Sequence, residues 1–271
     1  GPVNIPAMII SNAIFMPYEG FGRVLPAMTV TIGIAATLIL GLRHALRADP
    51  EAIVNEFRRG RDEVMGLVVY VPIIAVFGFM VLVRAIPTHF PDPGTPLIFM
   101  LGALLAMMVG RRVNGWQIVR EAVDGPVFTV VALLIAVGVF VQITTLTGVK
   151  GMLVVASFRV PKEAILLAAA VLLPLLGGSL TMLGSAAILG VPFVLALMGR
   201  NPIMLTAGVS LLCAFGQLVP PTAIVGSLAG QLMGISDYRE IIRKATAPTA
   251  FAIVVSLIAI ILANQLAPYL V

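Results

Sequence analysis

Two long apolar segments, residues 164–198 and 203–233, constrain the fold more than any other part of this chain. Each is interrupted near its centre by small or polar residues, the first from Gly177 to Ser185 and the second from Gly216 to Thr222. Apolar helices that are broken in this way form the midplane sites of many secondary transporters. Kinked lipid-facing helices are the alternative, since glycine and proline are common in membrane helices. Two consecutive interruptions, each with hydroxyl or amide groups, favour a functional site.

The composition predicts an all-α polytopic membrane protein. Of the 271 residues, 60% are hydrophobic and only 11% are charged, whereas a soluble domain carries about 25% charged residues. Apolar runs of near membrane-spanning length recur almost without charges. The net charge of +5 arises mostly in loops, where Lys and Arg set orientation, so no nucleic-acid partner is expected. The single cysteine, Cys213, and the two loop histidines, His44 and His89, form no metal-binding pattern.

The order of apolar and charged stretches predicts four segments. They are a half-helix, a span (24–42) and a basic cytoplasmic loop in 1–63; scaffold-type spans (64–84, 97–110 and 126–147) and a short outer segment (148–162) in 64–162; a hairpin and a broken helix in 163–234; and a cytoplasmic loop with the last span (248–267) in 235–271. Basic loops at 43–63, 111–120 and 235–247 are expected in the cytoplasm. This topology predicts a periplasmic C-terminus.

Residues 163–198 are expected to form a re-entrant hairpin with its tip at residues 177–185. Each arm is about 20 Å long at 1.5 Å per residue, too short for a hydrocarbon core of about 30 Å. Such a hairpin is tolerated where protein buries it or where it lines a watery cavity. Residues 201–234 are expected to cross once, as two half-helices joined by an unwound stretch from Gln217 to Thr222.

A weak internal repeat relates residues 5–42 to residues 220–267. Each copy begins with proline and a half-helix, at Pro6 and Pro221, and continues with a polar loop and a full span. The expected directions of the two copies are opposite, as in an inverted-topology repeat. On this reading Gly1 lies near mid-membrane, so an N-terminal half, or a complementary chain, is an expected partner.

At GGSLTMLGSAAILGVPFVLALM followed by AFGQLVPPTA, the chain resembles the C-terminal half of the large membrane subunit of tripartite ATP-independent periplasmic (TRAP) transporters, in the ion-transporter superfamily. The resemblance implies a bacterial inner-membrane, sodium-driven carrier with an elevator motion. It also implies a periplasmic binding protein that delivers an organic acid, and a small membrane subunit. The family hairpin usually carries a D-P-T-A-A type run, but the matching residues here are Met182 to Ala186, which lack the acid and place Ser185 near the hydroxyl position.

Sodium prefers oxygen ligands, which unwound backbone and hydroxyl groups supply. The expected cation ligands are Gly177, Gly178, Ser179, Ser185, Gln217, Val219, Pro220 and Thr222. An anionic substrate would seek free N–H groups at half-helix N-termini, which gives Ser185, Ala186, Pro221 and Thr222 as the expected substrate-binding residues. The alternative for the three hydroxyl residues is a bond to the i−4 carbonyl of their own helix. A mid-membrane Gln217 amide needs a partner, because an unpaired one costs several kcal/mol.

Three classes of function compete. A sodium-coupled carrier subunit fits the interruptions, with the sodium ion as coupling ion and no other metal or cofactor expected. A structural or proton-conducting subunit of a larger membrane complex is the alternative, although a proton path usually needs buried Asp, Glu, Lys or His, which the spans lack. An enzyme is not expected, since no His/Asp/Cys constellation lies in the apolar segments.

Overall fold

The computed structural model describes residues 4–45, 51, 67–85, 95–109, 114–117, 120, 126–232, 235 and 237–271. The chain divides into two compact units, one made of residues 1–47 and 130–271 and the other of residues 48–129. The regular elements of the described ranges are helices and no strands, which confirms the all-α prediction. Three helices, Val24–Leu42, Ala164–Ala196 and Tyr238–Ile261, are long and apolar enough to cross a membrane, and a bent pair, Val131–Leu146 with Val149–Phe158, adds a fourth candidate.

The elements follow one another along the chain with short connections. In the larger unit they are α1 (Ile5–Ala13), η1 (Tyr18–Phe21), α2 (Val24–Ala45), α7 (Pro126–Leu146, from residue 130), α8 (Val149–Phe158), α9 (Lys162–Ser185), η3 (Ala186–Gly190), α10 (Val191–Ala196), α11 (Pro202–Ala214), η4 (Phe215–Leu218), α12 (Ile224–Leu232), α13 (Tyr238–Ile261) and α14 (Ala263–Leu270). In the smaller unit they are η2 (Leu67–Tyr70), α4 (Val71–Ala85) and α5 (Thr95–Val109).

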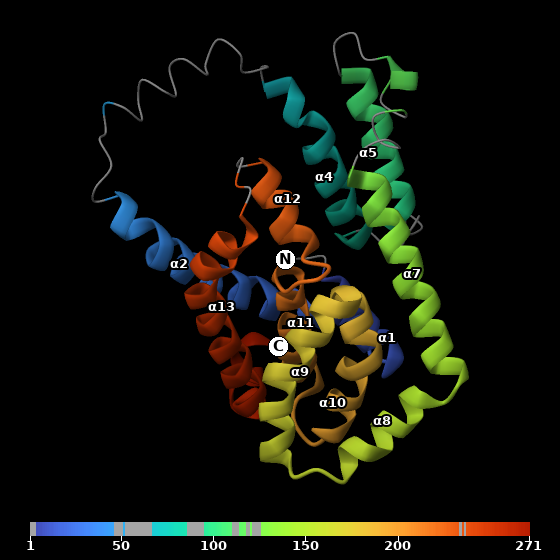
Figure 1. Cartoon of the computed structure of the whole chain (residues 1–271), viewed down its shortest axis with the longest axis vertical. Coiled ribbons are helices and arrows are strands. Elements are labelled where there is room, and N and C mark those ends of the chain that lie inside the picture. The colour runs from blue at the N-terminus through green and yellow to red at the C-terminus, as the bar shows by residue number, and fades with distance from the viewer. Residues whose placement is uncertain are drawn as a thin grey trace. The chain divides into compact units, whose positions relative to one another are not determined.

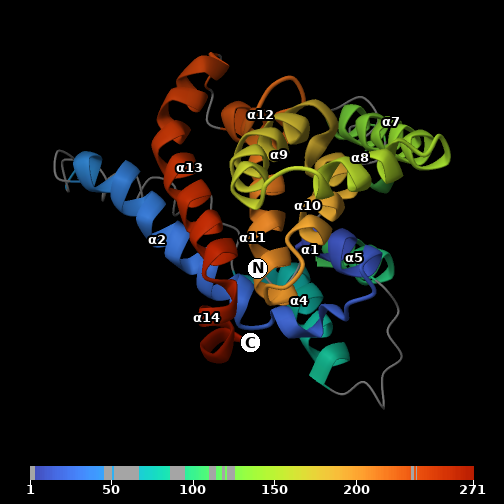
Figure 2. The ribbon, with the colours of Figure 1, turned by 90° about the horizontal axis from the view of Figure 1, so that it is seen from below.

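Helix α11 forms the centre of the larger unit. It lies among α9, α1, α10 and α13 (Figures 1 and 2), and residues 204–210, 212 and 213 are all buried. A helix that is apolar on every side is buried on every side, and α11 carries no charged residue. Its start is fixed locally, because the Asn201 side chain accepts hydrogen bonds from the N–H groups of Ile203 and Met204, each at 3.1 Å. Asparagine is among the most favourable N-cap residues.

The chain reverses direction inside the segment of α9, at Leu180 and Thr181. These two residues leave the helical conformation, and Thr181 has φ +62°. The Ser185 hydroxyl donates to the Leu173 carbonyl oxygen at 2.7 Å, although residues twelve apart in a straight helix would be separated by about 18 Å along its axis. Residues 162–179 and 182–196 are therefore two antiparallel arms of a hairpin, which Figure 1 shows side by side as α9 and α10.

The hairpin tip is narrower than the sequence predicts. Gly177, Gly178 and Ser179 are helical, as are Gly184 and Ser185, so the interruption covers only the two residues of the reversal. Glycine costs a helix only about 1 kcal/mol relative to alanine, and packing of the first arm outweighs that cost. Residues 177–179 therefore end the first arm rather than form an unwound loop.

Two other predictions need correction. The predicted span 64–84 begins outside the described residues, and its described part is a 3-10 turn (η2) followed by α4, whose apolar stretch of Val71–Val83 is shorter than a span. The predicted short outer segment 148–162 holds a helix, α8, at 68° to α7. The bend lies at Gly148, which has φ +75°, a conformation that glycine adopts without penalty. The predicted basic loop at 43–63 lies mostly outside the described residues.

One buried hydroxyl on α11 yields a stability prediction. Thr206 Oγ1 is the only buried side-chain oxygen or nitrogen in the described part of the chain that makes no hydrogen bond. A buried polar group without a partner costs about 1–3 kcal/mol. We expect Thr206→Val to stabilise the protein by about 1 kcal/mol, measured as a higher thermal midpoint. The control is Ser210→Val, expected to destabilise, because Ser210 Oγ accepts from Asn4 Nδ2 at 3.1 Å and donates to the Ala207 carbonyl at 2.8 Å; a lower midpoint for Thr206→Val would contradict the prediction.

Candidate functional site

The predicted break in the second apolar segment lies between α11 and α12. Helix α11 continues as the 3-10 turn η4, Phe215–Leu218, and Val219 is then extended at φ −95° and ψ 128°. Helix α12 begins at Ile224. Pro220 and Pro221 have no N–H group and cannot continue a helical hydrogen-bond ladder. The unwound stretch is therefore Val219 to Ala223, and Gln217 lies just before it in the 3-10 turn.

The first arm of the hairpin lies directly against this break. A Cβ atom on Gly177 would be 2.8 Å from Gly216 Cα and 3.0 Å from the Cys213 carbonyl oxygen. A Cβ atom on Gly178 would be 2.6 Å from Val219 Cγ1 and 2.9 Å from the Pro220 carbonyl oxygen. Small residues allow helix backbones in membranes to approach this closely. The glycines of the first arm are thus the condition for contact between the two interrupted segments.

A backbone hydrogen bond joins the two segments. The Thr222 N–H donates to the Gly178 carbonyl oxygen at 2.9 Å, and the Thr222 hydroxyl lies 3.5 Å from the Gly177 carbonyl oxygen. Carbonyls in the last turn of a helix have no partner within that helix, and these two end the first arm of the hairpin. Thr222 thus satisfies them from the other segment and fixes the register between the hairpin and the break.

The structure brings most of the predicted cation ligands together. Gly177, Gly178, Val219, Pro220 and Thr222 share the contacts just described. Pro221 belongs to the same unwound stretch and is exposed. Gln217 lies one residue from the Gly177–Gly216 contact and is half-buried, and its side-chain amide makes no hydrogen bond to any residue that the structure describes.

Three predicted ligands lie elsewhere or are occupied. Ser179 is exposed and donates to the Leu175 carbonyl at 3.3 Å, which is the i−4 bond considered above. Ser185 is fully buried between the hairpin arms, where its hydroxyl is bonded to Leu173. Ala186 is also fully buried, and its N–H is bonded to the carbonyls of Leu183 and Met182. The prediction of a free helix N-terminus at 184–186 is therefore wrong, because the helix starts again at Met182.

The oxygen atoms at the break fit a hard monovalent cation. Carbonyl, amide and hydroxyl oxygens are the ligands such ions take in unwound transporter helices. The Gln217 amide, the Thr222 hydroxyl and the carbonyls of the unwound stretch supply such atoms. Within the described ranges, no group of three or more His, Cys, Asp or Glu lies together.

Leu218 and Tyr238 also belong to the site, although sequence reasoning missed them. The Tyr238 hydroxyl, from the first residue of α13, donates to the Leu218 carbonyl oxygen at 2.7 Å. The two prolines at 220 and 221 could have indicated the acceptor, because they deprive the preceding carbonyls of helical donors. Nothing in the sequence indicates that a tyrosine twenty residues away supplies the bond.

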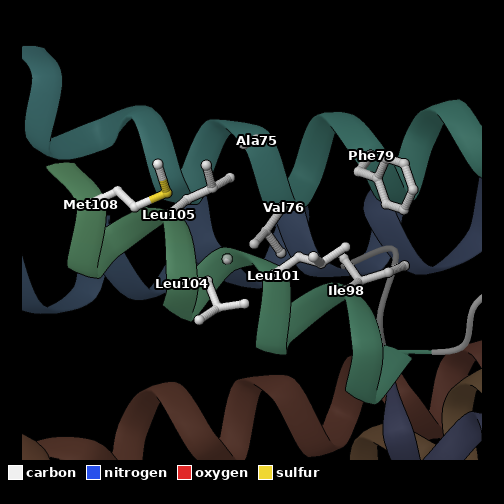
Figure 3. A pocket seen from close by; sticks show the side chains of 9 residues that line it. Ala75, Val76, Phe79, Ile98, Leu101, Leu104, Leu105 and Met108 are labelled. Atoms are coloured by element: carbon white, nitrogen blue, oxygen red, sulfur yellow. The ribbon is translucent and has the colours of Figure 1, made fainter. Parts of the chain in front are cut away.

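The smaller unit contains an apolar cavity of about 370 Å³ between α4 and α5. Figure 3 shows its lining, which is Ala75, Val76, Phe79, Ile98, Leu101, Gly102, Leu104, Leu105 and Met108. None of these side chains carries an oxygen or a nitrogen, so the cavity offers an ion or an organic acid no side-chain ligand. The candidate site is therefore at the break and not here.

An open polar hollow of about 630 Å³ lies at the other end of α11. Its polar groups close a turn: Arg200 Nη1 donates to the Ile260 carbonyl at 2.7 Å, and Asn264 Nδ2 donates to the Gly199 carbonyl at 3.2 Å. The Asn201 N–H donates in turn to Asn264 Oδ1 at 2.5 Å. These bonds join the end of the hairpin to the corner between α13 and α14, which is a structural role.

The described part of the chain thus defines an all-helical protein with helices of membrane-spanning length, in which a helix hairpin is docked on a broken helix. No protein-family model, no curated protein and no solved structure matches the chain.

Proposed function

We propose that this chain is a subunit of a sodium-coupled secondary transporter that imports an organic acid by an elevator motion. The observation that carries the proposal is the docking of the hairpin on the break, through the 2.9 Å bond from the Thr222 N–H to the Gly178 carbonyl and the contact of Gly177 with Gly216. A hairpin against an unwound helix concentrates carbonyl dipoles at one point, which is how such carriers hold a coupling cation.

The two copies of the internal repeat support an inverted-repeat carrier. Helices α1 and α12 are both nine residues long, and each is followed by a long apolar helix, α2 of 22 residues or α13 of 24. Both short helices lie against the α11–η4 helix. Asn4, which caps α1, donates from its amide to Ser210 of α11 at 3.1 Å. In the proposed arrangement the two short helices are half-helices of opposite direction about the same central helix.

The division into two units supports an elevator. The hairpin, α11, α12 and α13 pack with α1 and α2 in one unit, and residues 48–129 form another. We assign the first to the moving, substrate-bearing part and the second to the scaffold. Delivery of the acid by a periplasmic binding protein, a small membrane subunit, a complementary N-terminal half, the inner membrane and a periplasmic C-terminus belong to the same proposal and rest on the TRAP resemblance.

Sodium binding at the break is tested by thermal unfolding of the chain, purified with the chains that accompany it, in sodium against choline and potassium. We expect a sodium-specific rise of the midpoint, since sodium at about 100 times its Kd stabilises the folded state by about 2.7 kcal/mol. Gln217→Leu and Thr222→Val should abolish most of it. Both remove oxygen ligands, and Thr222→Val keeps the backbone bond to Gly178.

The matched control is Thr246→Val. This hydroxyl is exposed and bonds only within α13, to the Ile242 carbonyl at 2.7 Å, so the sodium response should equal that of the wild type. An intact complex without any sodium-specific rise would overturn the coupling proposal. Equal loss of the response in all three variants would show that it does not depend on the break.

A further inference from the structure

The carbonyl of Leu218 has no possible partner within its own helix. A 3-10 turn would require the N–H of residue 221, which is a proline, and an α-turn would require the N–H of Thr222, which donates to Gly178 instead. A helix end left in this state must take its donor from elsewhere. The Tyr238 hydroxyl is that donor, at 2.7 Å.

A second feature of the chain seats the tyrosine ring. A Cβ atom on Gly226 of α12 would clash with the Tyr238 hydroxyl and would lie 3.1 Å from ring atoms Cε2 and Cζ. Only a residue without a side chain at position 226 leaves room for the ring. The bond to Leu218 is thus held from two sides, by the start of α13 and by the first turns of α12.

The start of α13 is itself fixed. The Asp237 side chain accepts from the Arg239 N–H at 2.9 Å and caps the helix that Tyr238 begins. A rigid donor on one lone pair of a carbonyl leaves the second lone pair free and fixes its direction. Leu218 immediately precedes the unwound stretch, so its carbonyl is oriented beside the candidate cation ligands.

We infer that Tyr238 is a positioning residue that sets the cation affinity of the break by holding the Leu218 carbonyl, an inference that rests on the proposed sodium site. Tyr238 does not touch the ion. It orders one ligand of the break before the ion arrives, and a preorganised site binds more tightly than one that must be ordered on binding. The tyrosine also links the break to the basic start of α13, which carries Arg239, Arg243 and Lys244.

The test is Tyr238→Phe, which removes only the hydroxyl, followed by sodium titration of the thermal midpoint in the intact complex. We expect the half-saturating sodium concentration to rise about fivefold, the effect of one hydrogen bond. A merely structural role would lower the midpoint in choline and leave the half-saturating concentration unchanged, which would overturn the inference. The matched control is Tyr269→Phe, because Tyr269 is 82% exposed on α14 and should show wild-type values.

A second route to the same hydroxyl is Gly226→Ala, whose methyl group displaces the ring. It should weaken sodium binding in the same direction, and the double variant with Tyr238→Phe should lose less than the sum of the two. Additive effects would overturn the inference. A wild-type complex without any sodium response would remove the proposed function and this inference together, whereas a normal wild-type response that Tyr238→Phe leaves unchanged would remove this inference alone.

Discussion

Replacing Gly216 with valine is expected to abolish the sodium-specific rise of the thermal midpoint and to destabilise the protein by about 3 kcal/mol. A Cβ atom at this position would overlap the Gly177 backbone, and its third neighbour, the Gly177 carbonyl oxygen, is 3.0 Å away. Backbone cannot rotate aside as a side chain can, so the hairpin arm must leave the break. The measurement is the thermal midpoint of the intact complex in sodium and in choline.

The control for Gly216→Val is Gly138→Val in α7. A Cβ atom at Gly138 would have no atom within 4 Å, so the same chemical change adds no clash there. Valine is a slightly better helix former than glycine, and both midpoints should stay close to those of the wild type. A Gly216→Val complex that keeps its full sodium response would show that the cation does not require the hairpin at the break.

The parts of the site that the sequence predicts are those that backbone chemistry determines locally. Two prolines in succession remove two N–H donors, so the unwound stretch from Val219 to Ala223 follows from Pro220 and Pro221. The glycine pairs at 177–178 and 216–217 indicate where two apolar helices can approach, and the structure brings Gly177 and Gly216 together. The long apolar spans at 24–42 and in α13 follow from length and hydropathy.

The reversal of the hairpin could not be predicted from local preferences. A β-branched residue such as Thr181 rarely takes a positive φ, yet the chain turns at Leu180 and Thr181 and not at the neighbouring glycines. Burial decides the outcome, because Thr181 is fully buried and the glycines are used for contact with the break. For the same reason Ser185, predicted as a ligand, instead ties the two arms together through Leu173.

Long-range side-chain contacts were also beyond the sequence. Tyr238 looks like an ordinary interfacial residue at the start of a span, where tyrosine is frequent. Its role follows only from the contact with Leu218, which depends on how α12 folds back toward α13. Gly226 likewise has a meaning only beside that ring.

The second large effect is expected for Gly208→Val, where α11 crosses α13. A Cβ atom on Gly208 would lie 2.5 Å from Ile260 Cγ1 and 2.9 Å from the Ser256 carbonyl oxygen, so the added side chain must force the two helices apart. We expect a loss of about 3 kcal/mol or more of stability, since overpacking adds to the loss of a small-residue helix contact. In contrast to Gly216→Val, the midpoints in sodium and in choline should fall together, because the clash lies about 12 Å along the helix from Gly216. A selective loss of the sodium response in Gly208→Val would contradict this separation, and would mean that the contact between α11 and α13 is part of the cation site.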